Sequence, residues 1–296
     1  MKKVMLIATA LLAIACAKKG DESASKADAA PSEQTAEARL DAALTAQSEK
    51  AKARYPWRHP KETLQFFGIA PGMTVVDVLP GEDGYYTKIL LPYLGPGGSV
   101  IGADYDIDMW PLFGEFAPDL EKQKTWADDW MISASGWRGE NDAAVAGFAF
   151  GAVPVELKGT ADAVLFIRAL HHLNRLEEEG GFFTAALKDT MDLLKPGGIV
   201  GVVQHRAPAA NSDEWSEGDN GYLKQDQVIA FFEGAGFRFE GSSEINANPN
   251  DKPTESEFVW RLPPTLATSR DNPELEAQMR AIGESDRMTL KFVKPE

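Results

Sequence analysis

The amino-acid sequence predicts an α/β fold in which helices cover both faces of a mostly parallel sheet. Short apolar runs rich in β-branched residues alternate along the chain with segments whose apolar residues recur at helical spacing. This alternation is typical of a doubly wound sheet. The first run, residues 73–78, leads into a glycine-containing loop and then a helix. Such folds hold nucleotide-like ligands with a strand, a glycine loop and a helix in this order.

The glycine loop is acidic. Asp77 closes the strand, and Glu82 and Asp83 follow in the loop. A pyrophosphate favours a helix N-terminus free of carboxylates, and Leu79 and Asp83 stand near two glycine positions of the G-x-G-x-x-G pattern. The acids suit a ligand with positive charge, such as an α-amino group or a sulfonium. The candidate cofactor-binding residues in this stretch are Asp77, Pro80, Gly81, Glu82 and Gly84.

A second strand, residues 99–104, ends in an acid. Asp104 lies roughly 20 residues past the loop, where a carboxylate can accept hydrogen bonds from both ribose hydroxyls of a nucleotide-like ligand. Asp104 is therefore the sixth candidate for cofactor binding. Asp106 is a nearby substitute, and a solvated position at the end of the strand is the alternative for Asp104.

The remaining elements continue the alternation of strands and helices. The predicted helices are residues 61–67, 85–94, 180–194 and 222–234, with an aromatic-rich and mainly helical stretch at 108–137. The predicted strands include one within 143–157, then 161–167, 199–203, one that begins at 236, and 288–293, with a polar insertion at about 246–283 that holds a helix at 273–281.

The first residues resemble a bacterial lipoprotein signal. A basic start at residues 1–3 precedes a short apolar run, 4–15, which is too short to span a membrane. Cys16 follows directly and is the single cysteine of the chain. Lipidation at Cys16 would anchor an exported protein on the periplasmic face of a membrane; an ordinary cleaved signal is the alternative. We expect a signal peptide at 1–15, a flexible tether at 16–53 with an exposed helix from about residue 32, and one domain at 54–296.

Composition limits the classes of partner. The chain of 296 residues has 30 basic and 45 acidic residues and a net charge of −15. This balance disfavours nucleic acid and anionic membrane surfaces, whereas a hydrophobic content of 44% supports a core. We therefore expect a small-molecule substrate.

Four stretches together resemble the class I S-adenosylmethionine-dependent methyltransferases. They are V-V-D-V-L-P-G-E-D-G, G-A-D, D-A-V-L-F-I-R-A-L-H-H and L-K-P-G-G-I-V. The resemblance covers about residues 58–295 and implies S-adenosylmethionine as the cofactor and a Rossmann-like, mostly parallel seven-stranded sheet with an antiparallel last strand. The closing S-D-R-M-T-L-K-F-V-K-P is also similar to a bacterial branch that is often exported. That branch has P-G-G-G where this chain has the longer, acidic loop 80–84.

Histidines and arginines follow the fourth and fifth predicted strands. Arg168, His171 and His172 follow the fourth strand, and His205 follows the fifth. Ligands of open α/β sheets bind at the carboxyl ends of the strands, and the unperturbed pKa of histidine lies nearest neutrality. Methyl transfer needs positioning and, for some acceptors, a base. Core positions are the alternative for each histidine, and a two-histidine metal site lacks a carboxylate at ligand spacing.

Arg287 begins the last strand. If that strand is antiparallel, as the resemblance implies, Arg287 lies at the same edge as His171 and His205. His171 would then act as a base or orient the acceptor, and Arg287 would hold an anionic acceptor or the cofactor's carboxylate; pairing of Arg287 with Asp286 or a loop acid is the alternative. The candidate catalytic residues are His171, His205, Arg287 and Arg168.

The expected function is methyl transfer from S-adenosylmethionine to a small acceptor. Two alternatives remain open from the sequence. One is a non-catalytic exported lipoprotein that binds a nucleoside- or amino-acid-like ligand. The other is a nicotinamide-dependent oxidoreductase, which the acids of the glycine loop disfavour.

Overall fold

The structure, a computed structural model, describes residues 35–296. Its centre is one seven-stranded sheet in the order β3-β2-β1-β4-β5-β7-β6. The first five strands pair in parallel, and β7 runs antiparallel to β5 and β6. The predicted fold class is therefore confirmed. The strands are β1 (Thr74–Val78), β2 (Ser99–Asp104), β3 (Ala144–Ala149), β4 (Ala161–Ile167), β5 (Leu194–His205), β6 (Arg238–Ser243) and β7 (Arg287–Val293).

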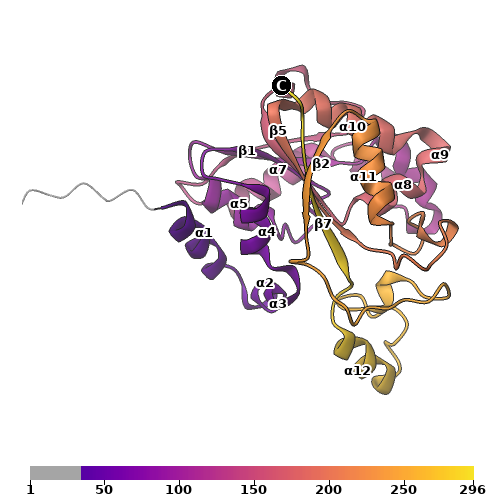
Figure 1. The fold of residues 1–296 in the computed structure, drawn as a ribbon. Coiled ribbons are helices and arrows are strands. Elements are labelled where there is room, and N and C mark those ends of the chain that lie inside the picture. Colours follow the sequence, from indigo (N-terminus) through magenta and orange to yellow (C-terminus); the bar gives the residue numbers. More distant parts are fainter. Residues whose placement is uncertain (1–34) are drawn as a thin grey trace, which may run out of the picture. The chain divides into compact units, whose positions relative to one another are not determined.

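Helices cover both faces of the sheet, as Figure 1 shows with α4 and α5 on one side and α10 and α11 on the other. Each face has its own apolar core. Two-sided cover explains why β1 reads as a continuous apolar run: Val75, Val76 and Val78 are fully buried. The longer helices on these faces are α4 (Pro60–Phe67), α5 (Thr87–Leu94), α7 (Trp126–Trp137), α10 (Phe182–Leu193) and α11 (Gln225–Gly234).

Short helical segments connect these layers. The aromatic-rich stretch after β2 is not one helix but three pieces, and the first of them holds Pro111 and the non-helical Gly114. Helix α7 then packs close to the sheet, since a Cβ at Gly102 would lie 2.6 Å from the Trp130 ring. The short segments are η1 (Ile107–Phe116), α6 (Leu120–Gln123), η2 (Val155–Leu157), α8 (Leu170–Arg175), α9 (Glu177–Gly180), η3 (Glu214–Ser216) and η4 (Val259–Arg261).

The N-terminal helices correct the predicted tether. Helices α1 (Ala36–Thr45), α2 (Glu49–Lys52) and α3 (Tyr55–Arg58) fall largely within the segment that we expected to be a flexible linker. Leu40, Ala43 and Leu44 of α1 are buried in the core that also contains α4 and α5. Three apolar residues at helical spacing in an alanine-rich segment are enough to dock it. The predicted signal peptide and Cys16 lie outside the described residues.

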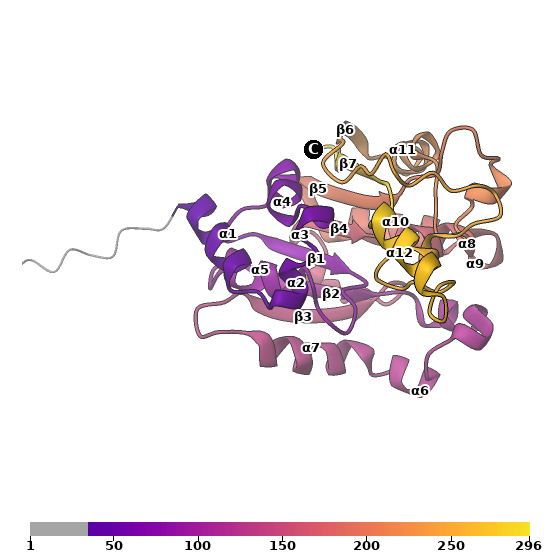
Figure 2. The same cartoon turned by 90° about the horizontal axis from the view of Figure 1, so that it is seen from below.

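The polar insertion lies at the carboxyl edge of the parallel strands. Figures 1 and 2 show α12 (Pro273–Ile282) beyond the end of the sheet at which β7 begins. The predicted helix is confirmed: Pro273 occupies its first turn and the Asn272 side chain caps it, with 3.0 Å from its Oδ1 to the Leu275 nitrogen. The rest of the insertion is largely irregular.

Candidate active site

The carboxyl edge of the sheet brings together side chains from four strands. Arg168 follows β4, His205 ends β5, and Arg287 begins β7 directly opposite His205 in the antiparallel register. The predicted placement of Arg287 at the edge that carries the histidines is therefore confirmed. Asp104 ends β2 at the same edge, two strands from β4.

His171 lies on α8, a helix that the sequence analysis did not predict. Its side chain is 4% exposed, and its Nδ1 lies 3.3 Å from the Gln204 Oε1. Gln204 donates its Nε2 proton to the Gly221 carbonyl, 2.9 Å away, so its Oε1 faces His171 and accepts the Nδ1 proton. This network assigns the neutral tautomer with a free lone pair on Nε2. Burial, reinforced by the neighbouring His172, holds the pKa of His171 well below its usual value.

Two further histidines surround His171. The His171 ring centroid lies 4.0 Å from that of His172 and 5.6 Å from that of His205. His205 is bonded through Nδ1 to Ser285 Oγ at 2.5 Å, and burial keeps its pKa well below the usual value. Burial, followed by the charge of Arg175, lowers the pKa of His172 to about 4. All three rings are therefore neutral at pH 7, a state in which an imidazole nitrogen can accept a proton.

Asp104 is a buried carboxylate with one free oxygen. It is 2% exposed, and its Oδ2 accepts hydrogen bonds from Gln123 at 3.1 Å and Trp110 at 3.3 Å. Its Oδ1 is buried and has no hydrogen-bond partner among the described residues. Burial raises the pKa of Asp104 to about 7. A buried acceptor without a donor is what a ligand hydroxyl would satisfy.

Asp77 makes a contact that the sequence did not predict. Its Oδ2 accepts a 2.7 Å hydrogen bond from Thr87 Oγ1, so the carboxylate pins the first turn of α5 to the end of β1. Burial raises the pKa of Asp77 to about 6. Asp77 is 2% exposed, and this contact makes it a support for the glycine loop; its role as a cofactor ligand stays a prediction.

The acids and glycines of the loop also differ from expectation. Asp83 forms an exposed ion pair with Lys50 at 2.8 Å, and Glu82 and Gly81 lie at the surface. Gly84 is buried with a φ of 56°, and a Cβ there would lie 2.3 Å from the Trp137 ring, so packing requires this glycine. Pro80, at the start of the loop, is partly buried. The loop acids therefore do not form a cluster for a positively charged ligand.

Arg287 is already paired in the folded chain. Its Nη1 lies 3.2 Å from Glu284 Oε2, and its Nη2 donates to the Trp57 carbonyl at 2.5 Å. The alternative of a nearby acid as partner is therefore confirmed, with Glu284 in that place, whereas Asp286 pairs with Arg206 at 2.9 Å. The hypothesis that Arg287 also holds an anionic acceptor or the cofactor's carboxylate stays a prediction.

Sequence reasoning missed several residues that complete the edge. Trp110 and Gln123 come from the stretch that we treated as core, yet both donate to Asp104. Trp260, from the insertion, lies 5.8 Å from the His171 ring. The insertion is polar and without periodicity, so no pattern identified Trp260 or Glu284. The signal that could have found Gln204 is its place one residue before His205 at the end of a strand.

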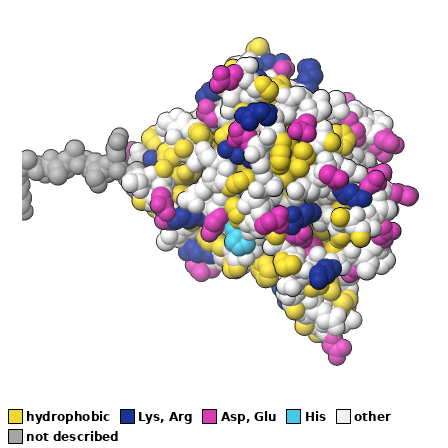
Figure 3. All heavy atoms as spheres, viewed as in Figure 1, with side chains coloured by type: hydrophobic (Ala, Val, Ile, Leu, Met, Phe, Trp, Pro, Cys, Tyr) yellow, Lys and Arg dark blue, Asp and Glu magenta, His cyan; other side chains and the backbone are white. Residues whose placement is uncertain are grey.

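Residues 35–296 contain no group of three or more His, Cys, Asp or Glu side chains arranged to hold a metal ion. In the same range, no helix has the length and apolar character to cross a membrane. On the face drawn in Figure 3, basic and acidic side chains lie interspersed with apolar ones.

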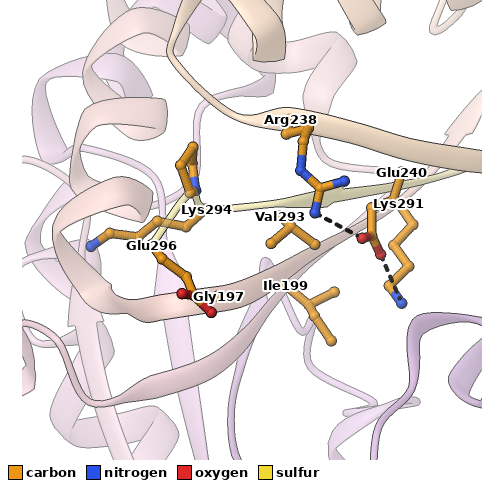
Figure 4. A pocket seen from close by; sticks show the side chains of 9 residues that line it. Gly197, Ile199, Arg238, Glu240, Lys291, Val293, Lys294 and Glu296 are labelled. Atoms are coloured by element: carbon orange, nitrogen blue, oxygen red, sulfur yellow. Dashed lines mark hydrogen bonds and ion pairs between the residues drawn. The ribbon is translucent and has the colours of Figure 1, made fainter.

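A surface hollow of about 560 Å³ lies at the opposite edge of the sheet, between β6, β7 and the start of β5. Figure 4 shows Arg238 and Lys291 pointing toward Glu240. Glu240 pairs with Arg238 at 3.0 Å and with Lys291 at 3.3 Å, so the charges are internally satisfied. It lies away from the carboxyl ends where ligands of such sheets bind, and we assign no chemistry to it.

This chain is similar to several solved structures at low sequence identity. No protein-family model and no curated protein matches it. A solved S-adenosylmethionine-dependent methyltransferase from Aquifex aeolicus is 18% identical, with a TM-score of 0.44 over 70% of this chain and 93% of its own. Geranyl diphosphate C-methyltransferase from Streptomyces coelicolor A3(2), solved with Mg²⁺, geranyl diphosphate and S-adenosylhomocysteine, is 14% identical, with a TM-score of 0.49 over 86% and 87%. The [4+2]-cyclase SpnF is 15% identical, with a TM-score of 0.48 over 80% of each chain.

Proposed function

We propose that this protein is an S-adenosylmethionine-dependent methyltransferase that acts on a small acceptor. The observation that carries the proposal is Asp104, whose buried Oδ1 faces no donor at the end of β2, beside the glycine loop after β1. A ribose hydroxyl would satisfy this oxygen. The antiparallel β7 between β5 and β6 separates the sheet from the dinucleotide-binding order, in which strands five and six are neighbours and parallel. This supports the methyltransferase over the oxidoreductase.

In the proposed reaction the chain positions the two reactants. When bound, S-adenosylmethionine would supply an electrophilic methyl group on its sulfonium, and Asp104 would hold its ribose. His171 would orient the acceptor by accepting a hydrogen bond at Nε2, because its Nδ1 proton is held by Gln204 and burial disfavours a positive charge on the ring. His205 orients the neighbouring ring and keeps Ser285 in place.

Titration calorimetry on the full chain tests the cofactor assignment. We expect S-adenosylmethionine and S-adenosylhomocysteine to bind and NAD not to bind. Asp104→Ala should weaken S-adenosylhomocysteine binding about 10- to 150-fold, as expected for loss of a charge-assisted hydrogen bond to the free Oδ1. Asp106→Ala is the matched control, because Asp106 caps η1 through the Asp108 nitrogen at 2.9 Å and faces a different group. Wild-type affinity in Asp104→Ala would refute the assignment.

We also propose lipidation at Cys16 and export to the periplasmic face of a membrane. The proposal is supported by the apolar run that ends at the single cysteine. Mass spectrometry of the mature N-terminus should find a lipid on Cys16, and Cys16→Ala should release the protein from membranes. A mature protein that begins elsewhere and fractionates as before in Cys16→Ala would contradict this proposal.

A further inference from the structure

Three arginines contact one buried carboxylate at the carboxyl edge of the sheet, and a fourth arginine lies near them. Glu284 is 3% exposed and accepts from Arg54 Nε at 2.6 Å, from Arg58 Nε at 3.3 Å and from Arg287 Nη1 at 3.2 Å. Arg168 is the fourth arginine, and Arg58 and Arg287 are the two positive charges that act on it most strongly. In a chain with a net charge of −15, this niche has four positive charges and one negative charge.

Arg168 is the arginine without a partner. Its side chain makes no hydrogen bond and no ion pair with any residue of the range 35–296, and its Nε is buried. The residue as a whole is half-buried. The backbone at Arg168 has a φ of 61°, which is strained for a residue with a Cβ, and its nitrogen donates to Val203. Strain of this kind concentrates at functional positions.

Two further donors in the niche are also unsatisfied. The Tyr85 hydroxyl and the Arg287 Nε are buried and have no partner within the described chain. The Tyr85 ring lies 4.6 Å beneath the Arg58 guanidinium, which places it in the same niche. Burial of donors and of positive charge without acceptors is unfavourable. An anionic group with several oxygens would satisfy both the donors and the charge, and a guanidinium matches carboxylate and phosphate geometry.

We propose that Arg168 binds an anionic group, a carboxylate or a phosphate, carried by the methyl acceptor, with Tyr85 and the paired arginines around it. That the acceptor carries the anion rests on the proposed methyltransferase function; the anion site itself does not. The histidine cluster lies at the adjacent strand end, so an acceptor held at Arg168 would present its reacting atom toward His171. The cofactor's own carboxylate is the other source of the same chemistry.

The test measures two ligands on the full-length protein by calorimetry: inorganic phosphate as the anion probe, and S-adenosylhomocysteine. The variants are Arg168→Gln, which removes the charge, and Arg168→Lys, which keeps it; both keep a Cβ at this position, so the backbone strain is the same as in wild type. Arg270→Gln is the matched control, because Arg270 is an exposed arginine away from the niche. We expect Arg168→Gln to weaken phosphate binding about 10- to 100-fold. Arg168→Lys should retain part of that binding, and Arg270→Gln all of it.

The outcomes separate the anion site from the proposed function. Loss of phosphate binding with unchanged affinity for S-adenosylhomocysteine supports the proposal. Loss of S-adenosylhomocysteine affinity, with unchanged affinity for 5′-methylthioadenosine, which lacks the carboxylate, would assign the site to the cofactor and overturn the assignment to the acceptor. Phosphate binding that is absent in wild type or unchanged in Arg168→Gln would overturn the anion site. If no variant binds S-adenosylhomocysteine but Arg168→Gln still loses phosphate, the anion site stands and the methyltransferase proposal fails.

Discussion

Two buried arginines at the same edge of the sheet have opposite surroundings. Every guanidinium nitrogen of Arg261 donates a hydrogen bond: Nη2 to Asp251 at 2.8 Å, Nε to Glu257 at 2.9 Å and Nη1 to the Tyr222 oxygen at 3.1 Å. The side chain of Arg168 has no hydrogen-bond partner in the described chain. The satisfied cluster ties the insertion to the segment after β5, whereas the unsatisfied one leaves donors for something outside the chain. The presence or absence of hydrogen-bond and ion-pair partners therefore distinguishes a structural arginine from a candidate binding residue better than burial does.

The largest expected effect comes from breaking the satisfied cluster. Asp251 has a fully buried side chain that pairs with Arg261 and also accepts from Tyr222 and from the Asp286 nitrogen. Asp251→Ala should lower the free energy of unfolding by about 3–5 kcal/mol, because it leaves a buried guanidinium without its partner. Urea denaturation measures this change. Glu276→Ala, which breaks the exposed pair with Arg280, is the control and should cost less than about 1 kcal/mol. Equal losses in the two variants would contradict a structural role for the cluster.

A second effect concerns pH and Asp104. The folded pKa of about 7 lies above the ordinary value of 3.8, so the folded state favours the protonated carboxyl. Its contribution to stability is fully present below about pH 4 and is lost as the pH rises through 7. Asp104→Asn keeps the neutral form at every pH. Relative to wild type, this variant should therefore gain about 2–4 kcal/mol of stability between pH 4 and pH 8. Parallel stability curves for the two proteins across that range would show that Asp104 is not held in a raised-pKa state.

The smallest expected effect comes from Arg168 itself. Without ligand, Arg168→Gln should leave the free energy of unfolding unchanged or raise it by up to about 1 kcal/mol, because it removes an uncompensated positive charge. Burial, followed by the charges of Arg58 and Arg287, already lowers the pKa of Arg168 to about 9. Thermal unfolding in phosphate-free buffer measures the change, with Arg270→Gln as control. A loss above about 2 kcal/mol would make Arg168 a structural residue like Arg261.

The sequence predicted the parts of the fold that follow from local patterns. β2 and β4 were bounded as the structure has them, because a turn or polar residue flanks each apolar run. β5 begins five residues before the predicted start, at Leu194, which pairs with Ala161; the register then shifts before pairing resumes at Ile199. Helix α8 was missed because it is short and because two histidines separate its apolar residues Leu170 and Leu173, so no apolar periodicity is visible.

The candidate site was predictable only in part, for a physical reason. That Asp104 and His205 would share an edge follows from the alternation of strands and helices, and the resemblance implied an antiparallel last strand that adds Arg287 to this edge. Which donor meets which acceptor does not follow, because it depends on side chains from distant segments. Asp77 illustrates the difference: its position was predicted, but its hydrogen bond to Thr87 was not.

The single carboxylate of Glu284 joins segments from opposite ends of the chain. Arg54 and Glu284 are 230 residues apart in sequence, and Arg58 and Glu284 are 226 apart. Contacts of such separation form late, after the entropy of closing the intervening chain has been overcome. A ribosome or a translocation channel must release nearly the whole polypeptide before this niche can assemble. A chain truncated before Glu284 would bring the arginines of the N-terminal helices to the sheet with no acid to hold them.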